Sequence, residues 1–206
     1  MKFILGTKLN MTQVFDQEGN VHPVTVLRAG PVTVTQVKES AKDGYSAVQI
    51  GFGDKRAALI AKAQKGHAKE LGNFRFFKEF RVAAPAHKVG DKFDASVFNE
   101  GDEVIVSSIS KGKGFQGTVK RHGFKGGSRT HGQKHSEREP GTISGGGRAG
   151  GRVAPGMRMS GRMGGDRVTV KNLKVVQINS AENLLLVSGA IPGRPGTLIE
   201  VVSVAK

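Results

Sequence analysis

The residues with the clearest chemical potential lie between positions 110 and 167, here called the basic stretch. It carries 13 Lys and Arg residues against three acidic residues, a net charge of +10, and holds 17 of the 30 glycines in the chain. Lys and Arg neutralise phosphate, while glycine lets a backbone approach another surface closely. This combination favours binding to a polyanion, and folded RNA offers both phosphates and crevices that a glycine-rich backbone can enter.

Charge and glycine alone fit other partners as well. A solvated, disordered loop is one alternative, and an acidic protein would also attract the charge. A membrane-surface binder needs an amphipathic basic helix, which the glycines disfavour. The stretch has only Val119, Ile143 and Val153 as branched aliphatic residues, so we expect it to form no core and no secondary structure of its own.

One string in the basic stretch, Gly112–Gly117, matches the G-x-G-x-x-G pattern of dinucleotide-binding loops and follows an expected strand. Such a loop needs a helix directly after it, because the helix N-terminus faces the pyrophosphate. Residues 118–129 contain three glycines and no apolar stripe at helical spacing, so the sequence predicts no helix and no nucleotide cofactor. An enzyme that binds a nucleotide or flavin on its sheet, with the basic stretch as a lid, remains the main alternative.

The histidines and acidic residues of the stretch are the residue types that could bind a metal ion or act in catalysis. His131 and His135 are four residues apart, which suits a metal ion on one helix face, but the neighbouring glycines disfavour a helix. We therefore expect them to contact phosphate or base, and we predict no metal site. Glu137 and Glu139 flank Arg138 and are expected to pair with neighbouring cations. The sequence has no G-x-S-x-G motif, and no catalytic residue is predicted.

The rest of the chain positions the basic stretch and has the pattern of a β protein. A helix is expected at 57–71, and strands are expected at 13–15, 21–27, 32–38, 45–52, 74–82, 103–109, 167–170, 173–178, 184–187 and 198–204. Neither side of the stretch has enough strands to cover its own edges, so both sides are expected to close one sheet. The predicted fold is mainly β, a closed β-barrel interrupted by a long basic excursion.

The expected globular β-barrel domain comprises residues 1–109 and 168–206, with a small α/β, helix-containing insertion at about 55–98. Residues 110–167 form the long glycine-rich basic extension. The chain has 206 residues, a net charge of +15 and no Cys, which excludes disulfide scaffolds and thiolate metal sites. No apolar run reaches the roughly 20 residues that cross a bilayer, and the chain begins without a signal-peptide core. An intracellular location is therefore expected.

Several strings of the sequence resemble the bacterial form of the third large-subunit ribosomal protein. Within the basic stretch they are Ser110–Gly117, Lys120–Phe124, His131–Gly132, Pro140–Ile143 and Met159–Gly164. Outside it, the strings that resemble the same family are Gly6–Gln13, Val168–Leu173 and Leu184–Val187. They occur in the order of the family, and the resemblance covers essentially the whole chain.

This resemblance implies a closed β-barrel of the translation-protein type that binds 23S rRNA directly, with a basic extension that reaches toward the peptidyl-transferase centre. It implies a structural constituent of the large ribosomal subunit that binds early and helps to nucleate assembly. The implied neighbours are the fourteenth and nineteenth large-subunit proteins, and the implied location is the cytoplasmic 50S subunit. It implies no enzymatic activity, cofactor, small-molecule substrate or membrane.

The candidate rRNA-binding residues are the basic and imidazole side chains of the basic stretch, because such groups contact phosphates and base edges in RNA. They are Lys111, Lys113, Lys120, Arg121, His122, Lys125, Arg129, His131, Lys134, His135, Arg138, Arg148, Arg152, Arg158, Arg162 and Arg167. The first four lie nearest to a strand end that pre-organises them, whereas Arg148 and Arg152 stand among glycines and lose more entropy on binding. We therefore expect the first four to supply more of the initial affinity than these two arginines.

Overall fold

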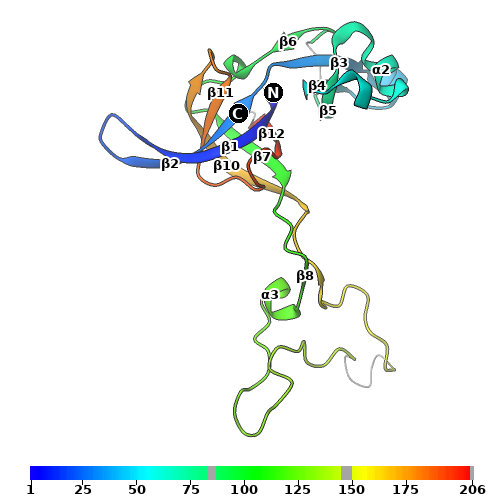
Figure 1. Ribbon diagram of the computed structural model, residues 1–206, viewed down its shortest axis with the longest axis vertical. Coiled ribbons are helices and arrows are strands. Elements are labelled where there is room, and N and C mark those ends of the chain that lie inside the picture. The colour runs from blue at the N-terminus through cyan, green and yellow to red at the C-terminus, as the bar shows by residue number, and fades with distance from the viewer. Residues whose placement is uncertain (83–86, 145–149, 205–206) are drawn as a thin grey trace. The chain divides into compact units, whose positions relative to one another are not determined.

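The computed structural model describes residues 1–82, 87–144 and 150–204 and is mainly β, as the sequence predicted. It forms two compact units, the first comprising Met1–Ile109 with Arg167–Lys206 and the second Ser110–Asp166. In chain order (Figure 1) the elements are β1 (Phe3–Phe15), β2 (Val21–Ala29), β3 (Val32–Lys38), α1 (Ser40–Asp43), β4 (Ala47–Asp54), η1 (Ala57–Leu59), α2 (Lys62–Ala68), η2 (Lys69–Leu71), β5 (Phe74–Arg81), β6 (Lys92–Phe93), η3 (Ala95–Val97), β7 (Glu103–Ile109), β8 (Phe115–Gln116), α3 (Thr118–His122), β9 (Gly161–Arg162), β10 (Arg167–Asn179), β11 (Leu184–Ser188) and β12 (Leu198–Ser203).

Six strands in the described part of the first unit form a closed ring in the order β1-β12-β7-β10-β11-β2, which β2 closes by pairing with β1. All of these pairings are antiparallel. The strand β7, which precedes the basic stretch, lies between β12 and β10, which both follow it. The prediction that strands from both sides of the stretch close one sheet is therefore confirmed.

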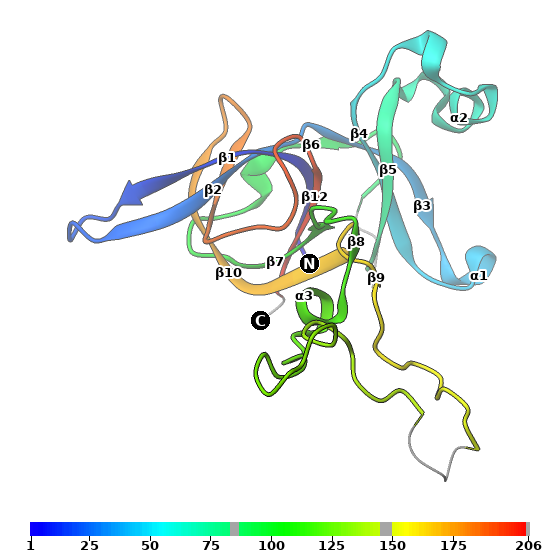
Figure 2. The same ribbon diagram turned by 60° about the horizontal axis from the view of Figure 1, so that its bottom comes forward.

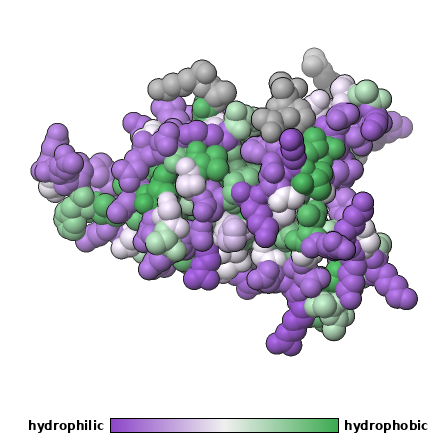
Figure 3. All heavy atoms as spheres, turned by 90° about the horizontal axis from the view of Figure 1, so that it is seen from above, coloured by the Kyte–Doolittle hydropathy of each residue, from purple (hydrophilic) through white to green (hydrophobic). Residues whose placement is uncertain are grey.

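The interior of the ring is filled by alternate side chains of its strands, as expected for a sheet with one buried face. On β7, β11 and β12 the buried aliphatic residues are Val104, Val106, Leu185, Val187, Ile199 and Val201. Each contributes about 1.5–3 kcal/mol of hydrophobic free energy relative to an exposed side chain. On the face shown in Figure 3, the visible hydrophobic side chains lie in patches between hydrophilic ones.

A second sheet in the first unit has the antiparallel order β5-β4-β3-β6. Figure 1 shows it beside the ring, with α2 in the connection between β4 and β5. Phe3 of β1 stacks on Phe80 of β5 with a distance of 4.7 Å between ring centroids, and it meets Phe93 of β6 edge-on. The ring and the second sheet therefore share one hydrophobic core.

The strand expected at 13–15 is only the end of the longer strand β1, Phe3–Phe15. Two further predicted elements of the first unit differ in the structure. The helix expected at 57–71 is interrupted, because Ile60 is buried in an extended backbone conformation and only Lys62–Ala68 are α-helical. The two strands expected after the basic stretch are one strand, β10. Its register shifts around Asn172, which takes a positive φ of 58°. The extended backbone at Ile60 and the register shift at Asn172 both depend on tertiary packing, which the local sequence pattern does not show.

Glu200 of β12 links three strands of the first unit. Its carboxylate lies 2.9 Å from Nζ of Lys78 on β5 and 2.5 Å from Nη2 of Arg167 on β10, and its side chain is only 14% exposed. Burial by itself raises the pKa of Glu200, but the hydrogen bonds from Lys78 and Arg167 outweigh it and hold the pKa below 4.5. The ionised carboxylate therefore stabilises the fold at pH values above the pKa of Glu200.

We expect Glu200→Gln to lower the free energy of unfolding at neutral pH by about 1–2 kcal/mol, since the exposed Lys78 and Arg167 can hydrate when the carboxylate is lost. Because the folded-state pKa of Glu200 is depressed, this contribution is lost as the pH falls through that pKa, so the stability difference from the wild type should narrow as the solution is acidified. Urea unfolding from neutral to acidic pH measures this difference, with the exposed Glu100→Gln as control. A difference that stays constant with pH would contradict the assignment.

Candidate nucleic-acid interface

The second unit begins and ends in a hydrogen-bonded stem, defined as residues 110–116 paired with residues 161–166. Lys113 N–H donates to the carbonyl of Met163, and Met163 N–H donates to the carbonyl of Gly114, both at 2.9 Å. The strands β8 and β9 continue this pairing (Figure 2). The prediction that the basic stretch has no secondary structure is therefore wrong at the stem. A local sequence pattern does not reveal this pairing, because the two sides of the stem lie far apart in the chain.

Gly164 allows the two backbones of the stem to approach closely. A Cβ at this position would collide with the carbonyl oxygen of Lys111, and its φ is +72°. We expect Gly164→Ala to open the stem, so that the amides of Lys113 and Met163 exchange with solvent faster while thermal unfolding of the first unit is unchanged. Hydrogen exchange measures this. Gly112→Ala is the matched control, because its Cβ would meet nothing within 4 Å; equal exchange in the two variants would refute the role of Gly164.

The helix α3 was also not predicted. It starts after Gly117 and ends at Gly123, which has a left-handed conformation with φ of 72° and donates its N–H to the carbonyl of Val119. The glycines at positions 123, 126 and 127 predicted that no helix forms here. In the structure Gly117 is instead the N-cap residue of α3 and Gly123 is its C-cap residue. Glycine is common at helix C-termini, because it adopts the left-handed conformation without strain.

Two candidate RNA-binding residues of α3 hydrogen-bond the protein backbone. Nη1 of Arg121 donates to the carbonyl of Met159 at 2.8 Å, and Nε2 of His122 lies 3.0 Å from the same oxygen. A carbonyl oxygen only accepts, so Nε2 of His122 carries the proton. A Cβ at Gly161 would lie 2.6 Å from Nη1 of Arg121, so glycine leaves the space that the guanidinium occupies. Arg121 thus fastens α3 to the segment that leads into β9.

Beyond α3, residues 124–141 form a loop whose two sides approach at Gly127. Its N–H donates to the carbonyl of Glu137 at 3.1 Å. Nε of Arg129 lies 2.6 Å from the Glu137 carboxylate, and both side chains are largely exposed. The prediction that Glu137 pairs with a neighbouring cation is confirmed.

The second unit is strongly cationic. Residues 110–166 include 12 Lys and Arg against three acidic residues. Within residues 1–82, 87–144 and 150–204, no three His, Asp or Glu side chains lie close enough to hold a metal ion. In the same part of the chain, no helix is long and apolar enough to cross a membrane. His131 and His135 are both exposed and lie outside any helix.

Comparison with known proteins identifies the family. The sequence pattern of the family described as "Ribosomal protein L3" matches residues 78–188. The large ribosomal subunit protein uL3 of Nocardia farcinica is 50% identical over 206 residues, which cover 98% of this chain and 93% of that protein. The uL3 protein of Herpetosiphon aurantiacus is 48% identical, covering 98% and 96%, and uL3c of Cyanophora paradoxa is 43% identical, covering 98% of each. The chain belongs to the ribosomal protein L3 family.

Membership of the ribosomal protein L3 family settles the class of protein. The family consists of structural proteins of the large ribosomal subunit, so the expectations of a ribosomal protein that is not an enzyme, located in that subunit in the cytoplasm, are confirmed. The matched residues, 78–188, include the whole second unit. The interface candidates therefore lie in a region that is characteristic of the ribosomal protein L3 family.

In this member of the ribosomal protein L3 family, most of the candidate rRNA-binding side chains lie at the surface. The exposed ones are Lys111, Lys113, Lys120, Lys125, Arg129, His131, Lys134, His135, Arg138, Arg152, Arg158, Arg162 and Arg167. Arg121 and His122 are half-buried, and Arg148 lies outside the described residues. Arg167 belongs to the first unit, where it pairs with Glu200. Contact of each of these residues with RNA stays a prediction.

One arrangement in the second unit was not predicted. The Arg158 guanidinium lies 5.0 Å from the centroid of the Phe124 ring, and that ring lies 5.9 Å from the His122 ring. Guanidinium, aromatic and imidazole planes are groups on which RNA bases stack. Arg158 and Phe124 are distant in the sequence, so the sequence showed only that both residue types can stack on RNA bases and did not show that they lie together.

Proposed function

We propose that this chain is a structural constituent of the 50S subunit that binds 23S rRNA directly through its second unit. The observation that carries the proposal is the concentration of cations there, 12 Lys and Arg against three acidic residues. Ten of the 12 are exposed, Arg121 is half-buried and Arg148 lies outside the described residues. The unit has little apolar material to fold around, and Phe115, Ile143 and Val153 are 74%, 37% and 45% exposed. A segment of this kind gains most of its order from the surface that it binds.

Phosphate neutralisation supplies the affinity in this proposal. Each Lys or Arg that meets a phosphate releases condensed counterions, so binding weakens as salt rises. Lys113 in the stem and Lys120 in α3 stand on backbone that is already hydrogen-bonded. Ordering them costs less entropy than ordering Arg152, which lies outside any helix or strand.

Finer parts of the proposal rest on the family resemblance of the sequence. The ring of the first unit is the β-barrel of the translation-protein type and sits on the RNA surface. The basic stretch extends into the RNA and reaches toward the peptidyl-transferase centre. The protein binds early, helps to nucleate assembly, and has the fourteenth and nineteenth large-subunit proteins as neighbours.

Sedimentation of cell extracts tests the proposed function. The tagged chain is expected to travel with 50S and 70S particles, because it is built into the large subunit. A tagged variant without residues 112–164 is the comparison, and it should stay nearer to the top of the gradient. A full-length chain that remains at the top while large subunits assemble normally would refute the proposal.

A further inference from the structure

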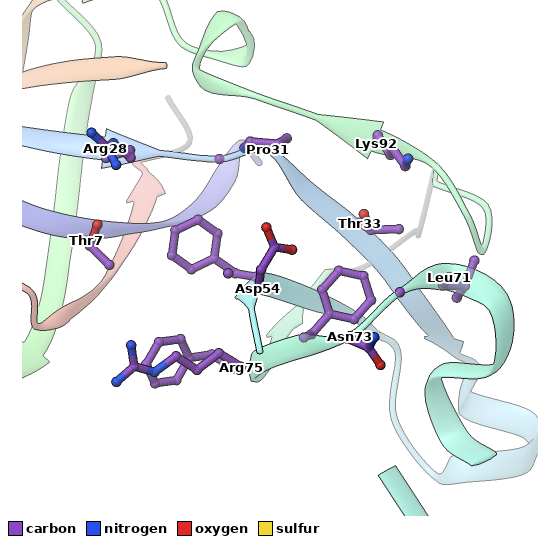
Figure 4. A pocket seen from close by; sticks show the side chains of 15 residues that line it. Thr7, Arg28, Pro31, Thr33, Asp54, Leu71, Asn73, Arg75 and Lys92 are labelled. Atoms are coloured by element: carbon purple, nitrogen blue, oxygen red, sulfur yellow. The ribbon is translucent and has the colours of Figure 1, made fainter. Parts of the chain in front are cut away.

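A pocket in the first unit lies outside the basic stretch and is not used by the function proposed above. It has a volume of about 490 Å³ and is lined by residues of β1 to β6 and the connections between them. Figure 4 shows the labelled side chains around it, with Arg28 and Lys92 on opposite sides and Asp54 between them. Pockets of roughly 300–1,000 Å³ accommodate small organic ligands.

Three cations from three different strands surround this pocket. They are Arg28 of β2, Arg75 of β5 and Lys92 of β6, all exposed, and the pocket has one carboxylate, Asp54. Among the described residues, none of the three is in an ion pair. In the first unit outside the pocket, Lys2, Lys38, Lys78 and Arg167 are each paired with an acidic side chain. Other described cations there, such as Lys42 and Arg56, are in no ion pair either. The unneutralised cations at the pocket fit an anionic ligand.

Aromatic side chains line the same pocket. Phe74 is half-buried, and its ring lies against Gly51, where a Cβ would come within 2.5 Å of the ring. Phe76 is also half-buried and lies beneath Arg75, whose guanidinium carbon is 5.1 Å from the ring centroid. A fixed aromatic ring beside cations is the arrangement on which single-stranded nucleic acids place a base while their phosphates meet Lys or Arg.

We propose that this pocket binds one unstacked nucleotide of the RNA, with guanosine preferred. The base stacks on Phe74, and the flanking phosphates meet Arg28, Arg75 and Lys92. The carboxylate of Asp54 points into the pocket (Figure 4) and only accepts hydrogen bonds, so it suits the adjacent N–H donors on the guanine edge. This inference rests on the proposed function, because it assumes that the chain binds large-subunit RNA.

Ultraviolet crosslinking of the full chain to transcribed 23S rRNA, followed by mass spectrometry, locates the nucleotide. Trypsin cuts after Lys69 and Arg75, so Phe74 falls on a short peptide of its own. We expect a guanosine monophosphate adduct on that peptide. Phe15 on the β1–β2 hairpin is the internal control, since it is 61% exposed and distant in sequence from the pocket. An adduct at Phe15 and none at Phe74 would overturn the proposal.

Binding measurements with the same RNA provide the second arm. We expect Arg28→Gln with Lys92→Gln to weaken binding about tenfold and to lower the salt slope by about two units, and Phe74→Leu to weaken it about tenfold through lost stacking. The matched control is Lys42→Gln with Arg56→Gln, which removes two exposed cations of the first unit outside the pocket. Equal losses in the pocket and control variants would overturn the proposal.

The outcomes separate this inference from the proposed function. Steeply salt-dependent binding by the full chain, with pocket variants that match the control, rejects the nucleotide site and leaves the RNA-binding function intact. No binding of 23S rRNA by the full chain rejects both. Unchanged RNA affinity with failed incorporation of the pocket variants into particles would assign the pocket to an acidic protein segment and would also overturn the nucleotide proposal.

Discussion

Removing residues 112–164 is expected to leave the first unit folded and to weaken binding to 23S rRNA by about a hundredfold or more. The deletion takes away 11 of the 32 Lys and Arg residues and two acidic residues, which lowers the net charge from +15 to +6. The fold should survive because Ile109 and Arg167 are direct partners across β7 and β10. A short Gly/Ser bridge can join ends that lie this close at little entropic cost.

Thermal unfolding and filter binding measure the two halves of this expectation. The matched control replaces residues 112–164 with an uncharged Gly/Ser segment of equal length, which keeps the loop and removes the cations. Both variants should unfold cooperatively and bind RNA equally poorly. Loss of cooperative unfolding in the bridged variant would show that the second unit helps to stabilise the ring, and tight binding by either variant would contradict the assignment of the interface.

The second large effect concerns which cations matter within the interface. Lys113→Gln with Lys120→Gln is expected to lower affinity for 23S rRNA about tenfold or more and to reduce the salt slope by about two units. Both side chains are exposed on backbone that the stem and α3 already fix. Arg121 is left unchanged in this test, because its substitution would also release the Met159 carbonyl.

The matched control is Arg138→Gln with Arg152→Gln, which removes the same charge from exposed positions outside helices and strands. These two side chains lose more entropy on ordering, so the affinity should stay within about threefold of the wild type. Salt titrations of both double variants measure the difference. Equal losses in affinity would show that charge alone, and not its support by the stem and α3, sets the strength of binding.

The first unit could be predicted to a large extent from local pattern. The strand expected at 103–109 coincides with β7, because the β-branched run Val104–Val106 follows the turn residues Gly101 and Asp102, and Gly101 takes the left-handed conformation of such a turn with φ of 84°. The need to cover strand edges also predicted that both ends of the chain contribute to one sheet. The helix expected at 57–71 failed, because burial of Ile60 in extended backbone is a tertiary effect that the Ala/Lys-rich run does not encode.

The candidate sites were predicted only in part. Net charge and glycine content located the basic stretch, since both are properties of composition. The stem and the bond from Arg121 to Met159 join residues that are distant in sequence, and Gly123 works as a helix cap only once α3 exists. The pocket cations Arg28 and Lys92 were not predicted either, because they are distant in sequence and only the fold of separate strands brings them together.

The dependence of 23S rRNA binding on salt tests the central claim most directly. If exposed Lys and Arg side chains of the second unit bind phosphates, a plot of log affinity against log salt concentration for the full chain should be linear with a slope of about −5 or steeper, corresponding to roughly six or more phosphate contacts. An affinity for this RNA that does not change with salt would contradict the claim that phosphate neutralisation holds the protein on RNA.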